Sequence, residues 1–164
     1  MVRIESEGPD ASVFEPFIRI SCYMFPCDQA SIMVLDPGRE YLELRSASGH
    51  PDRGQIVGSR QRVGHGIAGK VAEHGKSLLL GPTLEAKSYR KLNPRSYTIS
   101  AAMVVPVTYG DSVVGVMSVS SRSPGVAYSE DDLDILTTFA KAAGAHCWQA
   151  QQALASEAPP ELPL

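Results

Sequence analysis

Residues 64–70, GHGIAGK, have the residue types and the spacing of a phosphate-binding loop. Gly64, Gly66 and Gly69 form the GxGxxG pattern of dinucleotide-binding proteins. Gly64, Gly69 and Lys70 also supply GxxxxGK, which in nucleoside triphosphatases is followed by Ser or Thr. Loops of both kinds place backbone N–H groups against phosphate oxygens at the start of a helix. The segment therefore raises the question of whether this chain is a nucleotide-binding enzyme.

The residues around the loop complete neither motif. A dinucleotide site needs a buried strand before the glycines and a long crossover helix after them. Here the preceding segment carries two arginines, and Gly75 ends the helix after about two turns. Val71 occupies the position whose hydroxyl would hold magnesium. We therefore prefer a structural role, in which Gly66 and Gly69 let a short helix approach a sheet and Gly64 permits the turn before it.

No other residues form a pattern typical of a catalytic or metal site. The chain has an odd number of cysteines, with neither CxxC nor zinc-type spacing, and we expect buried, reduced thiols. They are Cys22, Cys27 and Cys147. His65 and His74 are single histidines with no nucleophile nearby, so surface or loop roles are expected. The sequence thus predicts no metal site and no enzymatic activity.

Charge and hydropathy favour a cytoplasmic protein with a cationic middle. The net charge is −3, but residues 50–99 carry nine Lys or Arg and only three Asp or Glu. This uneven distribution suggests a surface that faces anions, and a solvated positive face without a partner is the alternative. The longest apolar stretches are far shorter than the roughly 20 residues of a membrane span, and the N-terminus lacks an apolar signal segment. We expect no membrane association and no nucleic-acid binding.

Periodicity predicts a single domain at residues 12–154, preceded by a flexible N-terminus (1–11) and followed by a flexible tail or linker (155–164). Helices are expected at 12–25, 67–75 and 130–154, and strands at 30–35, 41–47, 77–80, 100–107 and 112–120. Residues 48–66 and 82–99 are expected to be mostly loop.

The last predicted helix has the clearest signals. Ser129 precedes three acidic residues, which predicts an N-cap, a capping box and favourable dipole charges. Apolar residues then recur at three- and four-residue steps. This stripe either contributes to a dimer formed through the terminal helices or packs on the chain's own sheet. The predicted interface comprises Phe14, Leu133, Leu136, Ala140, Ala143 and Cys147.

Taken in order, these segments resemble a GAF domain over about residues 12–150. The most specific pieces are GIAGKVAEHGKSLLL, the VPV that ends one central strand, the VVGVMSV of the next, and the acidic start of the last helix. The resemblance implies an α+β fold with a central antiparallel sheet of five or six strands. Terminal helices would lie on one face, and a ligand pocket closed by a short helix and loops on the other. Most such domains are sensors that relay ligand binding to a partner protein or an output domain.

Candidate pocket residues come from two parts of the chain. Residues 82–99 interleave basic and aromatic side chains, which suit an anionic ligand such as a nucleotide, and would form a lid. The lid candidates are Tyr89, Arg90, Arg95 and Tyr97, and the floor candidates are Ser46, Ile67, Val71, Ser100, Met103 and Met117. The alternative is an exposed basic loop over a core filled by its own side chains.

Several GAF subtypes fit the sequence poorly. No NKFDE-type signature of cyclic-nucleotide binders is recognisable, and residues 28–146 hold no cysteine for a bilin or for the pocket thiols of a free methionine sulfoxide reductase. Our first hypothesis is a dimeric, non-enzymatic signalling module with a small anionic ligand. An interaction adaptor with a degenerate pocket and, third, a reductase remain alternatives, and the ligand and any cofactor stay unidentified.

Overall fold

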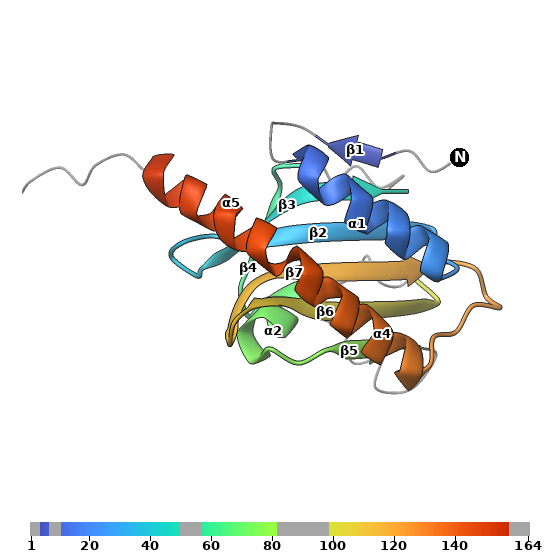
Figure 1. Cartoon of the computed structure of the whole chain (residues 1–164). Helices are drawn as coiled ribbons and strands as arrows, with labels where there is room; N and C mark the ends of the chain where they lie inside the picture. Colours follow the sequence, from blue (N-terminus) through green and yellow to red (C-terminus); the bar gives the residue numbers. More distant parts are fainter. Residues whose placement is uncertain (1–3, 7–10, 50–56, 82–98, 158–164) are drawn as a thin grey trace, which may run out of the picture.

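A computed structural model describes residues 4–6, 11–49, 57–81 and 99–157 (Figure 1). Its strands form one antiparallel sheet in the order β1-β3-β2-β7-β6-β5, with β4 paired to β3. The strands are β1 (Ile4–Ser6), β2 (Gln29–Leu35), β3 (Tyr41–Ser48), β4 (Arg60–Arg62), β5 (Leu78–Leu80), β6 (Ala101–Tyr109) and β7 (Ser112–Ser121). The helices are α1 (Ala11–Met24), α2 (Gly66–His74), α4 (Glu130–Ala140), the 3-10 turn η2 (Lys141–Ala143) and α5 (Gly144–Glu157).

The two faces of the sheet carry different helices. α1 and the rod formed by α4, η2 and α5 cross one face, and this helix face holds the larger core (Figure 1). Ile18, Met103 and Leu136 in that core are fully buried. The other face is covered in part by α2, whose apolar residues pack on β6 and β7 in a second, smaller cluster. The predicted α+β fold, with terminal helices on one face, is confirmed.

The predicted helices and strands are confirmed to within a few residues, except that the 3-10 turn η2 interrupts the last predicted helix and two strands are added. β1 lies in the segment predicted to be flexible, where its backbone pairs with β3. β4 lies in a segment predicted to be loop, and with both additions the described residues form a sheet of seven strands rather than five or six. Both are three residues long, too short to show a period in sequence, and both form only by pairing with β3.

The glycine-rich segment has the structural role that the sequence suggested. Gly64 and Gly66 have φ values of +84° and +65°, which disfavour residues with a Cβ atom. A Cβ atom on Gly69 would lie 2.5 Å from the carbonyl oxygen of Arg62 in β4. The glycines therefore let α2 lie directly against β4, beside an antiparallel sheet rather than at the head of a parallel one.

The prediction that the apolar stripe forms a dimer interface is corrected, because its residues are buried within one chain. Phe14, Leu133, Leu136, Ala140, Ala143 and Cys147 are each 8% exposed or less within one chain. They pack on the sheet, as the alternative held, because the α4–α5 rod lies flat along β6 and β7. Whether the protein dimerises stays a prediction, and an interface on these helices would have to use other side chains.

The start of α4 has the predicted capping box. The backbone N–H of Asp132 donates to Ser129 Oγ at 3.1 Å, and the backbone N–H of Ser129 donates to Asp132 Oδ2 at 2.8 Å. Replacing Ser129 by alanine leaves a helical N–H without its acceptor, so we expect a loss of about 1 kcal/mol in the free energy of unfolding, measured with urea. Thr138→Ala, on an exposed position of the same helix, is the control. Equal effects of the two changes would contradict a stabilising cap.

Candidate ligand-binding site

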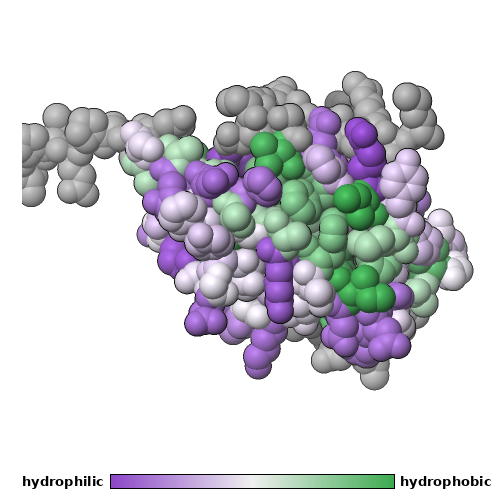
Figure 2. Space-filling model, viewed as in Figure 1, coloured by the Kyte–Doolittle hydropathy of each residue, from purple (hydrophilic) through white to green (hydrophobic). Residues whose placement is uncertain are grey.

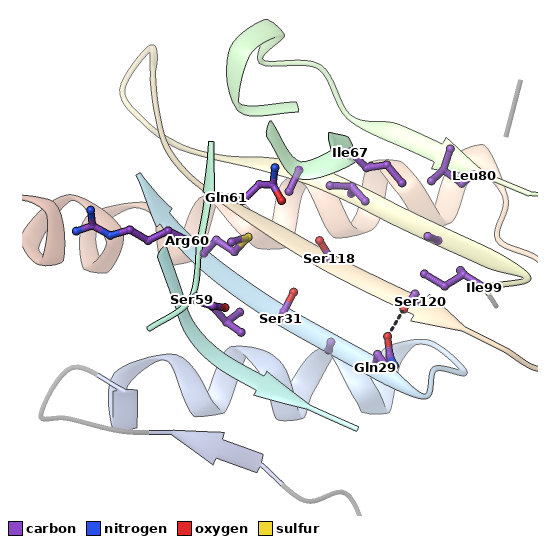
Figure 3. Close-up of a pocket in the computed structure, with 16 residues that line it drawn as sticks. Gln29, Ser31, Ser59, Arg60, Gln61, Ile67, Leu80, Ile99, Ser118 and Ser120 are labelled. Atoms are coloured by element: carbon purple, nitrogen blue, oxygen red, sulfur yellow. Dashed lines mark hydrogen bonds between the residues drawn. The ribbon is translucent and has the colours of Figure 1, made fainter. Parts of the chain in front are cut away.

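A cavity of about 350 Å³ lies on the sheet face opposite the terminal helices, between the sheet, α2 and β4 (Figure 3). Its volume falls within the range of small-molecule sites in proteins. Residues from seven segments line it: Gln29, Ala30, Ser31, Met33, Leu44, Ser59, Arg60, Gln61, Ile67, Ala68, Leu80, Ile99, Ala102, Val104, Ser118 and Ser120.

The floor of the cavity is polar although it belongs to the two central strands. Gln29 pairs with Ser120 across β2 and β7, and Ser31 pairs with Ser118, so all four side chains share one face. Ser120 Oγ donates to Gln29 Oε1 at 3.4 Å (Figure 3). Such central strands are ordinarily apolar on a face that packs against a filled core. Here they supply hydroxyl and amide groups that can donate and accept hydrogen bonds.

The walls are mainly apolar. Ile67 and Ala68 of α2, Leu80 of β5 and Ile99 surround the polar floor (Figure 3). Val104 of β6 continues the apolar surface beside Ser118, its cross-strand neighbour. A ligand with a flat or aliphatic body and a polar edge would match this distribution.

The charged side chain in the described lining is directed away from the cavity. Arg60 contributes to the lining, but its Nε atom lies 3.6 Å from Glu43 Oε2, and its guanidinium lies over the Tyr41 ring, 5.7 Å from the centroid. Figure 3 shows this side chain pointing away from the serines of the floor. Within the described residues, the lining thus offers hydroxyl, amide and apolar groups to a ligand, and no cluster of cationic side chains faces the cavity.

A family model described as the GAF domain matches residues 22–146. The chain belongs to the GAF domain family. The match covers the strands β2 to β7, α2 and the cavity, and it confirms the family that the sequence resembled.

Solved structures share the fold at low sequence identity. The GAF domain of an Acinetobacter phosphoenolpyruvate-protein phosphotransferase is 18% identical, with a TM-score of 0.71 over 90% of this chain and 87% of that chain. The GAF-B domain of DevS from Mycobacterium smegmatis is also 18% identical, with a TM-score of 0.67 over 90% and 99%. A type II free methionine-R-sulfoxide reductase from Thermoplasma acidophilum is 18% identical, with a TM-score of 0.69 over 85% and 92%. No curated protein matches this sequence.

The GAF domain places only part of the predicted pocket set at the cavity. Ile67 lines it. Val71, one turn further along α2, instead packs in the smaller cluster with Leu35 and Val116. Ser100 directly precedes β6 and donates from Oγ to the carbonyl oxygen of Arg122 at 3.0 Å, outside the lining. The predicted lid residues Tyr89, Arg90, Arg95 and Tyr97 lie outside the described residues.

The two predicted floor methionines lie on the opposite side of the sheet. Met103 and Met117 are fully buried in the helix-face core, and Ser21 Oγ of α1 lies 3.8 Å from Met117 Sδ. Successive side chains of a strand point to opposite faces. The floor is therefore formed by their neighbours in sequence, Ala102 and Ser118, which corrects the prediction by one residue in each strand.

Ser46 is displaced from the predicted floor by a bulge. Regular alternation from Leu44, which lines the cavity, would also bring Ser46 to that face. The register between β2 and β3 shifts between Ile32 and Met33, however, so Met33 pairs with Leu44 and Ile32 with Ser46. The extra residue, Arg45, turns Ser46 toward the helix-face core, where it is fully buried.

The main residues that the sequence analysis missed are the polar pairs of the floor. Gln29 and Ser31 alternate with apolar residues in β2, and Ser118 and Ser120 alternate with Met117 and Val119 in β7. A period of two in polarity within otherwise apolar strands was the available signal. It marks which face is polar, but not that a cavity lies above it.

The cysteines of this GAF domain lie outside the cavity lining. Cys147 is fully buried against Gly115, and burial raises the pKa of its thiol to about 12. Cys22 and Cys27, by contrast, are only partly buried, which corrects the expectation of three buried thiols. In the described part of the chain no three potential metal-ligating side chains cluster, and no helix has the length and apolar character to cross a membrane.

Proposed function

We propose that this GAF domain is a sensory module that binds a small molecule in the cavity and relays its bound state through the terminal helices. The observation that carries the proposal is the polar floor. Gln29, Ser31 and Ser120 are each 8% exposed or less, yet they lie beneath a cavity rather than beneath packed side chains. Burying polar groups costs free energy unless they are hydrogen-bonded, so a polar floor favours a site for a hydrogen-bonding occupant.

The ligand that fits this cavity is small and amphipathic. Its body would contact Ile67 and Ile99, and its polar edge would bond to the serines of the floor. We further propose that it is anionic, with a nucleotide as one candidate. The described walls do not supply cationic side chains that could bind an anionic ligand. This part of the proposal therefore rests on the basic residues of the segment 82–99 in the sequence.

The central strands offer a direct route from the cavity to the helices. Ser118 faces the cavity, and the next residue toward the N-terminus, Met117, contacts Ser21 of α1 on the other face. In the same strand, a Cβ atom on Gly115 would lie 3.2 Å from Cys147 Sγ of α5. A ligand that shifts β7 would therefore alter the packing of both terminal helices, which are the elements able to act on a partner or output domain.

Ligand binding can be tested with thermal unfolding across a panel of nucleotides, metabolites and anions. A ligand at a hundred times its dissociation constant adds about 2.7 kcal/mol of stability, which corresponds to a rise of about 5–10 °C in Tm. Mass spectrometry of small molecules retained by protein isolated from its own cells would identify the natural ligand. If no compound raises Tm and no molecule is retained, the proposal loses its support.

An interaction adaptor is the second candidate, and exposed apolar side chains on the helix face favour it. Figure 2 shows hydrophobic residues gathered along α1 and across to α4. Ile20, Met24, Ile135 and Trp148 are between 38% and 50% exposed. Homodimerisation through this surface is a further proposal. Native mass spectrometry that finds a protein partner but no retained ligand would favour the adaptor over the sensor.

We propose that the protein is not an enzyme and that it acts in the cytoplasm. Two of the solved structures similar to it are free methionine-R-sulfoxide reductases, so this activity is the one to test. The described cavity lining contains no cysteine, which argues against a thiol-based cycle there. Reduction of free methionine sulfoxide that is lost when all three cysteines are replaced would contradict this proposal.

A further inference from the structure

Two of the three cysteines lie together at the end of α1. Cys22 is in the last turn of the helix, and Cys27 follows it in the short connection to β2. Both are partly exposed, and their thiols are hydrogen-bonded to each other. Cys22 Sγ also lies 3.6 Å from Ser48 Oγ of β3. The pair thus has an exposed side, a mutual contact and a polar neighbour.

The pair lies at a junction of several elements. Tyr128 Oη donates to the carbonyl oxygen of Pro26 at 2.7 Å, and the ring of Tyr128 meets that of Phe25 edge to face at 6.4 Å. Tyr128 directly precedes the N-cap of α4. Figure 1 shows the end of α1 and the connection from β7 to α4 at the same edge of the molecule. A covalent change at these thiols would therefore act on the junction of both terminal helices.

The two thiols have different acidities. The pKa of Cys22 is lowered to about 6, chiefly because the Cys27 thiol donates a hydrogen bond to its sulfur; burial opposes this shift and Ser48 supports it. The same hydrogen bond, together with burial and the nearby charge of Asp28, raises the pKa of Cys27 well above its usual range. Tyr128 and Asp28 are both titratable groups beside the pair, and burial together with the charges of Cys27 and Asp28 raises the pKa of Tyr128. The hydrogen bond therefore favours the thiolate at Cys22 and the protonated thiol at Cys27.

We propose that Cys22 and Cys27 form a redox-active dithiol site that reacts with hydroperoxides and closes to an intramolecular disulfide. The Cys22 thiolate attacks one oxygen of the peroxide, the S–O bond forms as the O–O bond breaks, and the other oxygen takes up a proton and leaves as water or as an alcohol. Cys27 then gives up its proton and attacks the Cys22 sulfur. The S–O bond breaks, the S–S bond forms and water leaves. Two thiols lose two electrons, the peroxide gains them, and a low-molecular-weight thiol can reverse the oxidation.

The site is separate from the ligand cavity and does not depend on the proposed sensory function. The sulfurs contact α1 and β3 on the helix face, whereas the cavity lies on the opposite face of the sheet. A disulfide is shorter than the hydrogen bond that it replaces. Closing it draws the end of α1 toward the start of β2, next to the Tyr128–Pro26 hydrogen bond.

The first test is the rate of alkylation by iodoacetamide at pH 6, followed for each cysteine by peptide mass spectrometry. A thiol of pKa about 6 is half ionised there, whereas an ordinary thiol is almost fully protonated. After allowing for its lower intrinsic nucleophilicity, Cys22 should react about tenfold faster than glutathione. Cys147 in the folded protein should be nearly inert, because it is fully buried. Alkylation of Cys22 no faster than that of Cys147 would overturn the proposal.

The second test is limited oxidation with hydrogen peroxide. We expect the mass of the full chain to fall by two hydrogen atoms, and we expect no disulfide-linked dimer. The non-reduced digest should contain a peptide pair in which Cys22 is joined to Cys27. Cys147→Ala should behave as the unaltered protein. Cys22→Ala and Cys27→Ala should both lose the linkage. A sulfinic acid on Cys22 with Cys27 still free, or a linkage only between chains, would overturn the proposal.

A matched pair of variants separates the hydrogen bond from the disulfide chemistry. Cys27→Ser keeps a hydroxyl donor beside Cys22, so alkylation of Cys22 at pH 6 should stay within a few-fold of the original rate. Cys27→Ala removes the donor, and the rate should fall by at least about tenfold. Circular dichroism of both variants shows whether each is folded. Equal rates in the two folded variants would contradict the role assigned to Cys27.

Discussion

Replacing Gly144 by alanine is expected to destabilise the GAF domain by about 3 kcal/mol. The first residue of α5 has helical φ and ψ of −56° and −48°, where alanine is ordinarily preferred to glycine by about 1 kcal/mol. Here, however, a Cβ atom would overlap the carbonyl oxygen of Thr108 and lie 3.0 Å from its carbonyl carbon. Because the added Cβ atom is fixed to the backbone of α5 and meets the backbone carbonyl of Thr108, no side-chain rotation can relieve the overlap. The helix must move off the β6–β7 hairpin.

Urea unfolding measures this change, and Gly125→Ala is its control. Nothing lies within 4 Å of a Cβ atom at Gly125, and its φ is not in the left-handed region. We expect that variant to be neutral or slightly stabilised, because alanine restricts the unfolded chain. If Gly144→Ala were as stable as Gly125→Ala, the close approach of α5 to the hairpin would be wrong.

Replacing Ser118 by leucine is expected to weaken ligand binding by tenfold or more. The side chain of Ser118 points into the middle of the cavity, between Ser31 and Val104 (Figure 3). A leucine there occupies ligand volume and removes a hydrogen-bonding hydroxyl from the floor. The free energy of unfolding should change by less than about 1 kcal/mol, because the cavity has room for the new side chain.

The measurement is the Tm increase caused by whichever panel compound stabilises the protein most. Ser112→Leu places the same substitution in the same strand at an exposed position of the hairpin, outside the lining, and should leave binding unchanged. Ser118→Ala should weaken binding by only several-fold, since it removes about 1 kcal/mol of hydrogen bonding without filling the cavity. Full binding by Ser118→Leu would place the ligand elsewhere.

The predicted elements were accurate where a pattern is local. The Ser129 capping box and the left-handed Gly75 that ends α2 each involve neighbours within a few residues, so their signals stand in the sequence. The strand pair β6 and β7 could be located from the apolar runs on either side of Gly110, whose φ is +61°. β1 and β4 had no comparable signal, because only pairing with β3 makes them strands.

The candidate site was harder to predict than the fold. The sequence located Ile67 of α2 at the pocket, but it assigned Met103 and Met117 to the wrong face. Strands covered on both faces are apolar throughout, so hydropathy alone does not show which alternate residues face a cavity. The displacement of Ser46 depends on a bulge defined by the partner strand, which no feature of β3 by itself reveals.

The sequence by itself therefore determined the family, the order of helices and strands, and the structural role of the glycine-rich segment. The family follows from the resemblance to known GAF domains, whereas the order of the elements and the role of the glycines follow from periodicity, caps and turns, which are interactions between residues close in the chain. Only the tertiary structure decided that the helical stripe packs inside one chain, that the floor of the cavity is made by Gln29, Ser31, Ser118 and Ser120, and that Cys22 contacts Cys27. Each of these depends on which face of a strand or helix meets a distant segment, and that is set by strand register and packing across the whole sheet.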